Sequence, residues 1–158
     1  MLDQAESLAN TFRANTGLLR RLTEGVTHAE SLRTPGERVN CTNWVLGHVI
    51  SGRHKAPVLL GFEGFWDETR MSIYQTGSTA IIADGQAVPF EILIRELERS
   101  LQALEAAFET ASTELLNSVK ETDRGEKPVQ EHIEGLGWRE TFHVGQVDIL
   151  PAYAHEIK

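Results

Sequence analysis

Two histidines and a glutamate are the residues of this sequence whose types and spacing best suit chemistry. His48 lies three residues after Val45, so on a helix the two would share one face. Glu140 and His143 are also three residues apart, and both fall on the apolar stripe of the last helical segment. A buried carboxylate without a partner is costly, so an ordinary bundle core would not contain Glu140. We therefore expect both imidazoles to point into the interior, where facing helices commonly build metal sites.

These side chains allow more than one interpretation. Neutral imidazoles bind Zn, Ni, Fe and Cu, so His48 and His143 could be metal ligands. A single inward histidine is more often a hydrogen-bonded core residue, and Glu140 could pair with Arg139 or with a basic residue of another helix. The pattern of residues leaves a metal site and a structural polar core both open.

The other candidate residues are less suited to a shared site. His132 would lie on the same helix face as His143 but roughly 16 Å away along the axis, too far to share a metal. His54 would turn away from His48 on a regular helix. We expect Cys41 to be a small buried apolar residue. The sequence contains no GxSxG, HExxH, phosphate-binding glycine loop or dinucleotide fingerprint.

Four helical segments must position these residues. Apolar side chains recur at three- and four-residue steps in residues 3–27, about 42–60, 89–115 and the stretch that follows Pro128. The stretch 61–88 is irregular, and we expect it to contain a short helix and to pack as a lid over one end of the molecule. No β-hairpin signal is present. The predicted fold is all-α, a single domain (1–158) that forms a four-helix bundle with a long crossover between its second and third helices.

Composition and charge exclude several classes of protein. Apolar residues make up 41% and charged residues 24% of the chain, as in ordinary soluble globular proteins, and no stretch is long and apolar enough to span a bilayer. The formal net charge of −8 disfavours nucleic acid and anionic membranes as partners, and no basic cluster offsets it. The single cysteine excludes an intrachain disulfide. With no secretory signal at the start, we expect a cytoplasmic protein.

Two stretches of the sequence resemble the signatures of one family. Residues 43–48 (NWVLGH), followed by Arg53 and by the LLG of 59–61, resemble the first signature of the DinB/YfiT-like metalloenzyme superfamily. The stretch 129–146, which ends in RETFHVGQ, is similar to its second signature, HExxHxGQ. The resemblance implies a four-helix bundle, usually a homodimer, that binds a divalent metal (Ni, Zn or Fe) through three histidines. Some members use that metal to activate a low-molecular-weight thiol, such as bacillithiol or mycothiol, for transfer or isomerisation.

The resemblance carries over to only part of the metal site. His48 matches the first ligand and His143 the last, but Arg139 stands at the position of the middle ligand. An arginine stays protonated and cannot donate a lone pair to a metal. Three arrangements remain open. Glu140 could supply the third metal ligand, Arg139 could pair with Glu140 in a structural polar core, or Arg139 could bind the carboxylate of a ligand.

The sequence therefore predicts an interior polar pocket and three possible functions for it. In the first, His48, His143 and Glu140 hold a divalent metal in a thiol-transferase-like enzyme, with Arg139 and Glu140 as the catalytic residues. In the second, a metal-free protein binds a small anionic ligand or a partner there without catalysis. In the third, the polar core only fixes the helix register of a homodimer. Asn15, a polar residue on the first apolar stripe, is a further candidate neighbour of this pocket.

Overall fold

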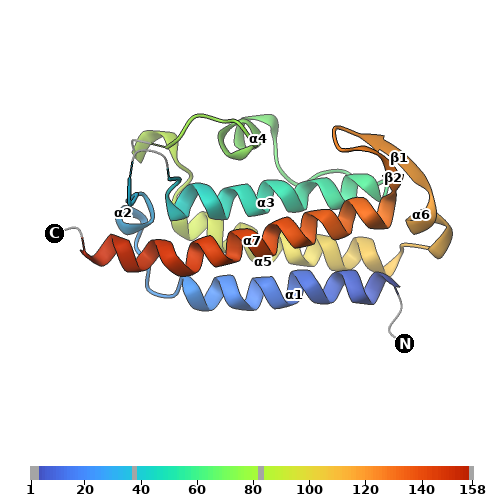
Figure 1. The fold of residues 1–158 in the computed structure, drawn as a ribbon, viewed down its shortest axis with the longest axis horizontal. Helices are drawn as coiled ribbons and strands as arrows, with labels where there is room; N and C mark the ends of the chain where they lie inside the picture. The colour runs from blue at the N-terminus through green and yellow to red at the C-terminus, as the bar shows by residue number, and fades with distance from the viewer. Residues whose placement is uncertain (1–3, 37–38, 82–83, 157–158) are drawn as a thin grey trace.

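Four long helices lie side by side along most of the length of the molecule (Figure 1). The computed structural model describes residues 4–36, 39–81 and 84–156. The four long helices are α1 (Gln4–Leu22), α3 (Thr42–Leu59), α5 (Phe90–Glu109) and α7 (Val129–Glu156). The shorter elements are α2 (His28–Ser31), α4 (Glu68–Tyr74), the 3-10 helix η1 (Asp84–Gln86), α6 (Thr113–Asn117), β1 (Val119–Thr122) and β2 (Gly125–Pro128). This arrangement confirms the predicted four-helix bundle with its long crossover, here between α3 and α5.

The apolar stripes of the helices meet in two separate core clusters. Leu46, Leu93 and Val147 belong to the cluster nearer the end at which α3 begins, and Phe12 and Leu104 belong to the cluster nearer the hairpin. The three- and four-residue spacing of these side chains puts them on one face of each helix, which is why the helices pack. Both clusters are built from all four long helices, so each is a layer of the same bundle.

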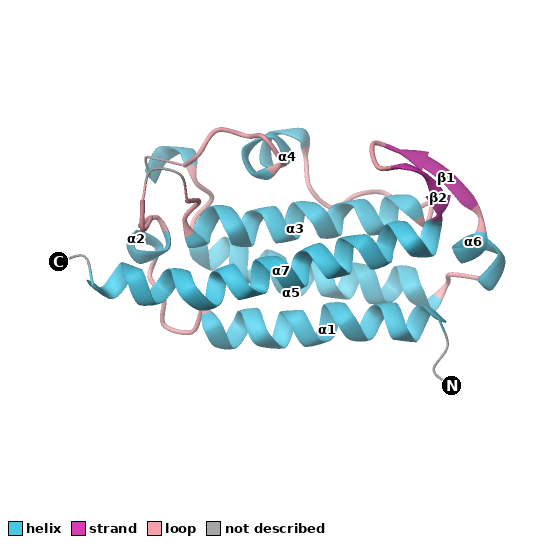
Figure 2. Ribbon diagram, in the orientation of Figure 1, coloured by secondary structure: helices cyan, strands magenta, loops and turns pink. Residues whose placement is uncertain are grey.

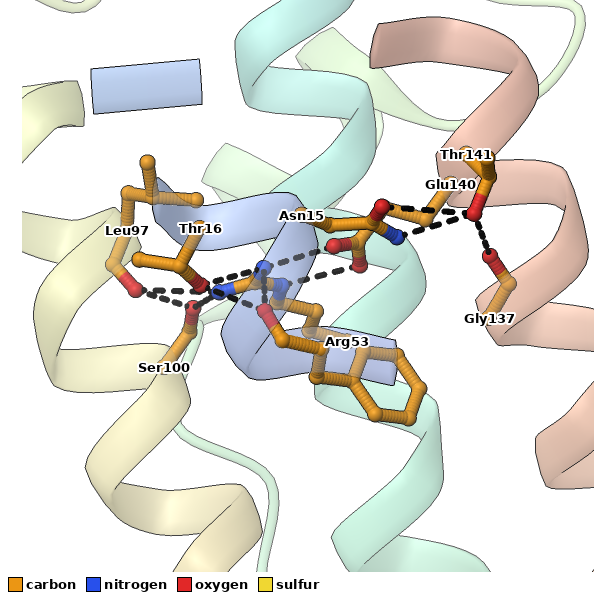
Figure 3. Close-up of polar contacts among 9 residues, drawn as sticks. Asn15, Thr16, Arg53, Leu97, Ser100, Gly137, Glu140 and Thr141 are labelled. Atoms are coloured by element: carbon orange, nitrogen blue, oxygen red, sulfur yellow. Dashed lines mark hydrogen bonds and ion pairs between the residues drawn. The ribbon is translucent and has the colours of Figure 1, made fainter. Parts of the chain in front are cut away.

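A polar layer separates the two apolar clusters, and its centre is Arg53 of α3. The Arg53 Nε and Nη2 atoms donate to the two carboxylate oxygens of Glu140 on α7, at 2.9 and 2.6 Å. Nη2 also donates to the Thr16 hydroxyl on α1 at 2.8 Å, and Nη1 donates to the Ser100 hydroxyl and the Leu97 carbonyl of α5. Arg53 is 1% exposed. One guanidinium thus links all four bundle helices (Figure 3).

The crossover packs along α3 instead of over an end of the bundle. As predicted it contains a short helix, α4, but Figure 1 shows α4 lying beside the length of α3, so the expected lid over one end is wrong. The buried Tyr74 ring fixes this position, because its hydroxyl donates to Asn43 and accepts from the Val88 backbone. A Cβ at Gly47 would lie 2.3 Å from that ring, so only glycine permits the contact.

A small β-hairpin joins α6 to α7, so the all-α prediction, which included no hairpin, was wrong for this segment. Strands β1 and β2 pair antiparallel, with Val119 opposite Pro128 and Thr122 opposite Gly125. Their side chains are mostly polar and exposed, so the two strands lack the alternation of apolar and polar residues from which a strand is predicted. Gly125 adopts a positive φ of 90°, which closes the turn. In the described part of the chain, no helix has the length and apolar character needed to cross a membrane.

The buried ion pair of the polar layer should contribute measurably to the stability of the fold. Replacing Arg53 by leucine should lower the free energy of unfolding by about 3–5 kcal/mol, because Glu140 would remain buried without a partner. Urea denaturation followed by circular dichroism measures this loss. The exposed ion pair between Arg20 and Glu98 supplies a matched control. Arg20→Leu should cost at most about 1 kcal/mol.

The double variant Arg53→Leu/Glu140→Leu should be more stable than Arg53→Leu alone, because it removes the unpaired charge. Equal, small losses for Arg53→Leu and Arg20→Leu would contradict the importance given to this layer.

Candidate functional site

A small cavity opens beside the polar layer, between α3 and α7. Its volume is about 40 Å³, enough for a few water molecules or one small polar group. It is lined by Phe12, His48, Val49, Ser51, Gly52, Arg53, Lys55, Gln75, Thr76, Arg124, Leu136, Arg139, Glu140 and His143. The structure therefore brings the four residues singled out in the sequence to one pocket. The His48 and His143 rings meet edge to face, with their centroids 4.8 Å apart.

His48 is held in a single tautomer. Its Nδ1 atom lies 2.6 Å from the carbonyl oxygen of Tyr74, which can only accept, so Nδ1 carries the proton. Its ring stacks on the indole of Trp44, with the centroids 4.7 Å apart. Burial lowers the pKa of His48 to about 4, and the nearby cations Arg139 and Lys55 act in the same direction. At neutral pH the imidazole is therefore uncharged, with a lone pair on Nε2.

His143 is held in the same way and has an unused nitrogen. Its Nδ1 atom donates to Oε1 of Gln146, one turn further along α7, at 2.7 Å. The Nε2 atom is buried and has no hydrogen-bond partner, while the residue as a whole is 9% exposed. Burial lowers the pKa of His143, and Arg139 adds to that effect. A buried acceptor without a donor costs about 1–3 kcal/mol, so this atom is a place for a ligand to donate a hydrogen bond.

The carboxylate of Glu140 faces Arg53 and not Arg139. Both of its oxygens accept from the Arg53 guanidinium, and Glu140 is 4% exposed. Its partner is therefore a basic residue of another helix, which is one of the alternatives that the sequence allowed. The proposed pairing of Arg139 with Glu140 is absent from the described ion pairs.

Three cations face the pocket and give it a positive charge. Lys55 of α3, Arg124 of the hairpin turn and Arg139 of α7 all line the cavity. Within residues 4–36, 39–81 and 84–156, none of the three forms an ion pair. The one carboxylate in the lining is Glu140, whose charge Arg53 already balances. A pocket with three unbalanced cations in a chain of formal net charge −8 is a local exception to the charge of the molecule.

The donors in the pocket do not amount to a three-ligand metal centre. In the described part of the chain, no group of three or more His, Cys, Asp or Glu side chains is placed to hold a metal. Zinc sites use at least three protein ligands, whereas this pocket offers two imidazole nitrogens beside a guanidinium. Metal binding by His48, His143 and Glu140 therefore remains a prediction.

The remaining sequence candidates have structural roles outside the pocket. His132 Nε2 donates to the Lys120 carbonyl at 2.9 Å and so ties the hairpin to α7. Asn15 exchanges hydrogen bonds with Thr141 and does not line the pocket (Figure 3). Cys41 is 1% exposed, as predicted, and burial raises the pKa of its thiol. His54 accepts the backbone N–H of Trp66.

Three residues of the site were not predicted from the sequence. The first is Arg53, which lies on the buried stripe of Val49, Arg53, Ala56 and Leu60, at steps of four and three. That spacing could have shown a buried charge opposite Glu140. The second is Lys55, whose sequence context does not distinguish it from a surface lysine. The third is Arg124, which lies in a hairpin that could not be predicted from the sequence.

Comparisons with known proteins support the fold. No protein-family profile matches the sequence, and no curated protein matches it. The crystal structure of a conserved protein from Enterococcus faecalis has a TM-score of 0.77 and 12% identity, over 99% of both chains. A mutant of a mycothiol-dependent maleylpyruvate isomerase has a TM-score of 0.66 and 14% identity, over 93% of this chain and 63% of that one. At these identities the likeness establishes the fold alone, and the chain has a DinB-like helical fold.

Proposed function

We propose that this chain is a member of the DinB-like superfamily whose bundle pocket binds a small organic anion. The observation that carries the proposal is the charge of the pocket. Arg53 balances Glu140, while Lys55, Arg124 and Arg139 face the cavity with no counter-ion among the described residues. An anion would supply a counter-charge, and it would be attracted most strongly beside Arg139, because that side chain is half-buried and so less screened by solvent.

Arg139 is the residue best suited to bind the anionic group. A guanidinium matches a carboxylate in shape and forms two parallel hydrogen bonds with it. Arg139 is half-buried, so it loses less of this attraction to solvent than the exposed side chains of Lys55 and Arg124. The isomerase of similar fold is named for acting on maleylpyruvate, which is itself a carboxylate, and this agrees with the proposal.

The neutral imidazoles determine which substituent of the ligand fits beside its anionic group. The lone pair on His143 Nε2 would oppose a carboxylate oxygen but would accept a hydrogen bond from a hydroxyl or a thiol. The ligand we propose is therefore a carboxylate that carries a hydroxyl or thiol on a neighbouring carbon. The carboxylate binds Arg139, and the hydroxyl or thiol hydrogen points at His143.

A pair of probes of nearly equal shape tests the charge requirement. The wild-type protein should bind 2-hydroxypropanoate and should bind its uncharged amide at least tenfold more weakly, as measured by isothermal titration calorimetry. Arg139→Gln should weaken binding of the acid by about 10- to 100-fold, because it removes a charge-assisted hydrogen bond. The same variant should leave the weak binding of the amide unchanged. Equal affinity of the wild-type protein for the acid and the amide would refute the proposal.

A glycine in the lining allows the cavity to be filled without removing a polar group. A Cβ at Gly52 meets nothing within 4 Å, so Gly52→Leu should fold, and its side chain should occupy the pocket. We expect loss of acid binding with no loss of thermal stability, since leucine is a better helix former than glycine, by most of the roughly 0.8–1.0 kcal/mol that separates glycine from alanine.

Gly17 on α1 is the matched control, because it too has open space around it and does not line the cavity. Gly17→Leu should bind the acid as the wild type does. Unchanged binding by Gly52→Leu would place the ligand elsewhere.

A metal-dependent, thiol-transferase-like enzyme is the second candidate. It is favoured by the hydrogen bonds of the two imidazoles, since each has Nδ1 bound to an acceptor, which leaves the lone pair on Nε2, and both residues line the pocket. This is the usual arrangement of metal-binding histidines. Protein purified without a histidine tag can be assayed for Ni, Zn, Fe and Mn by elemental analysis.

If the pocket is an anion site, the protein should contain far less than one equivalent of metal, before and after incubation with excess Zn or Ni. A stoichiometric metal that His48→Ala removes would favour the second candidate instead.

A further inference from the structure

The polar cavity is too small to hold a whole organic ligand. Its volume of about 40 Å³ suits a carboxylate group and one neighbouring substituent. Sites that enclose most of a small organic molecule are several times larger. The rest of a ligand bound at Arg139 must therefore lie outside this cavity.

A second hollow adjoins the polar cavity and is open to receive the rest of such a ligand. It has a volume of about 220 Å³ and shares Lys55, Arg124 and Leu136 with the polar cavity. We call it the side groove; its lining consists of His54, Lys55, Val58, Leu59, Thr122, Arg124, His132 and Leu136. Figure 2 shows the hairpin standing over the ends of α3 and α7, the two helices that contribute most of this lining.

The walls of the side groove are mainly apolar in character. Val58 and Leu59 of α3 and Leu136 of α7 all line it, and Val58 is 47% exposed. His132 has both ring nitrogens directed at hairpin atoms, Nε2 at the Lys120 carbonyl and Nδ1 at the Thr122 hydroxyl. It therefore adds ring surface to the groove and leaves no ring nitrogen for a ligand.

From the polar cavity to the side groove, the lining changes from positively charged to apolar. The cations Lys55 and Arg124 stand at the junction, Arg139 lies on the polar side, and the apolar side chains lie beyond the junction. A molecule with a negative head and an apolar body is complementary to this order, whereas a small dianion or a fully polar molecule would leave Val58 and Leu59 exposed to water.

Resting on the anion site proposed above, we propose that the ligand is an amphipathic carboxylic acid, whose head binds in the polar cavity and whose hydrocarbon body lies in the side groove. Each methylene buried against the groove should strengthen binding by up to about fourfold, the equivalent of about 0.8 kcal/mol.

A series of straight-chain 2-hydroxy acids tests this proposal. The dissociation constants of 2-hydroxypropanoate, 2-hydroxypentanoate and 2-hydroxyheptanoate are measured by isothermal titration calorimetry with the full chain. We expect affinity to rise along the series in the wild-type protein. Binding of the shortest acid tests the anion site, and the increase with chain length tests the side groove.

Two valine variants show whether the increase arises in the side groove. Val58→Ser should reduce the gain in affinity with chain length and leave binding of 2-hydroxypropanoate unchanged. Val39 is 45% exposed and does not line either hollow, so Val39→Ser is the matched control and should keep the full gain.

The outcomes separate the two proposals. The side-groove proposal is overturned if the shortest acid binds but affinity does not rise with chain length. It is also overturned if affinity rises as much in Val58→Ser as in the wild type. Either result leaves the anion-site proposal intact. Failure of every acid to bind overturns the anion site, and the side-groove proposal falls with it.

Discussion

The ion pair between Arg53 and Glu140 is the contact on which the rest of the structure depends. It lies where the two apolar clusters meet, and the hydrogen bonds of Arg53 reach α1, α5 and α7 from its own place on α3. A buried guanidinium must satisfy all its donors, so each of these helices has to present an oxygen at one height. The layer therefore fixes the axial register of the bundle, which apolar contacts alone would leave less well determined.

The same ion pair decides the chemistry of the pocket. If Glu140 were free, the cavity would hold a carboxylate beside two imidazoles, a donor set suited to a divalent metal. Because Arg53 takes both carboxylate oxygens, the cavity is left with neutral imidazoles and the positive charges of Lys55, Arg124 and Arg139. Arg139, at the position where the signature that the sequence resembles has its middle histidine, changes the charge in the same direction. Both features favour an anion over a cation as the ligand.

Much of the fold could be predicted from the sequence, because the apolar stripes have the helical period and the intervening stretches are long or glycine-rich. It could also be predicted that His48 and His143 lie close together, since each shares a helix face with buried apolar residues. The sequence left the partner of Glu140 open between Arg139 and a basic residue of another helix, because helical spacing shows which face Arg53 occupies but not which residue lies opposite it. The hairpin was missed because its strands are polar and exposed, and with it the contribution of Arg124 to the pocket.

A crystal structure grown in the presence of both Zn²⁺ and 2-hydroxyheptanoate tests the central claim most directly, because it lets the pocket choose between a cation and an anion. We expect the carboxylate on Arg139, the hydroxyl within hydrogen-bond distance of His143 Nε2, and Glu140 still bound to Arg53. A zinc ion held by His48, His143 and a Glu140 side chain turned away from Arg53 would contradict the account.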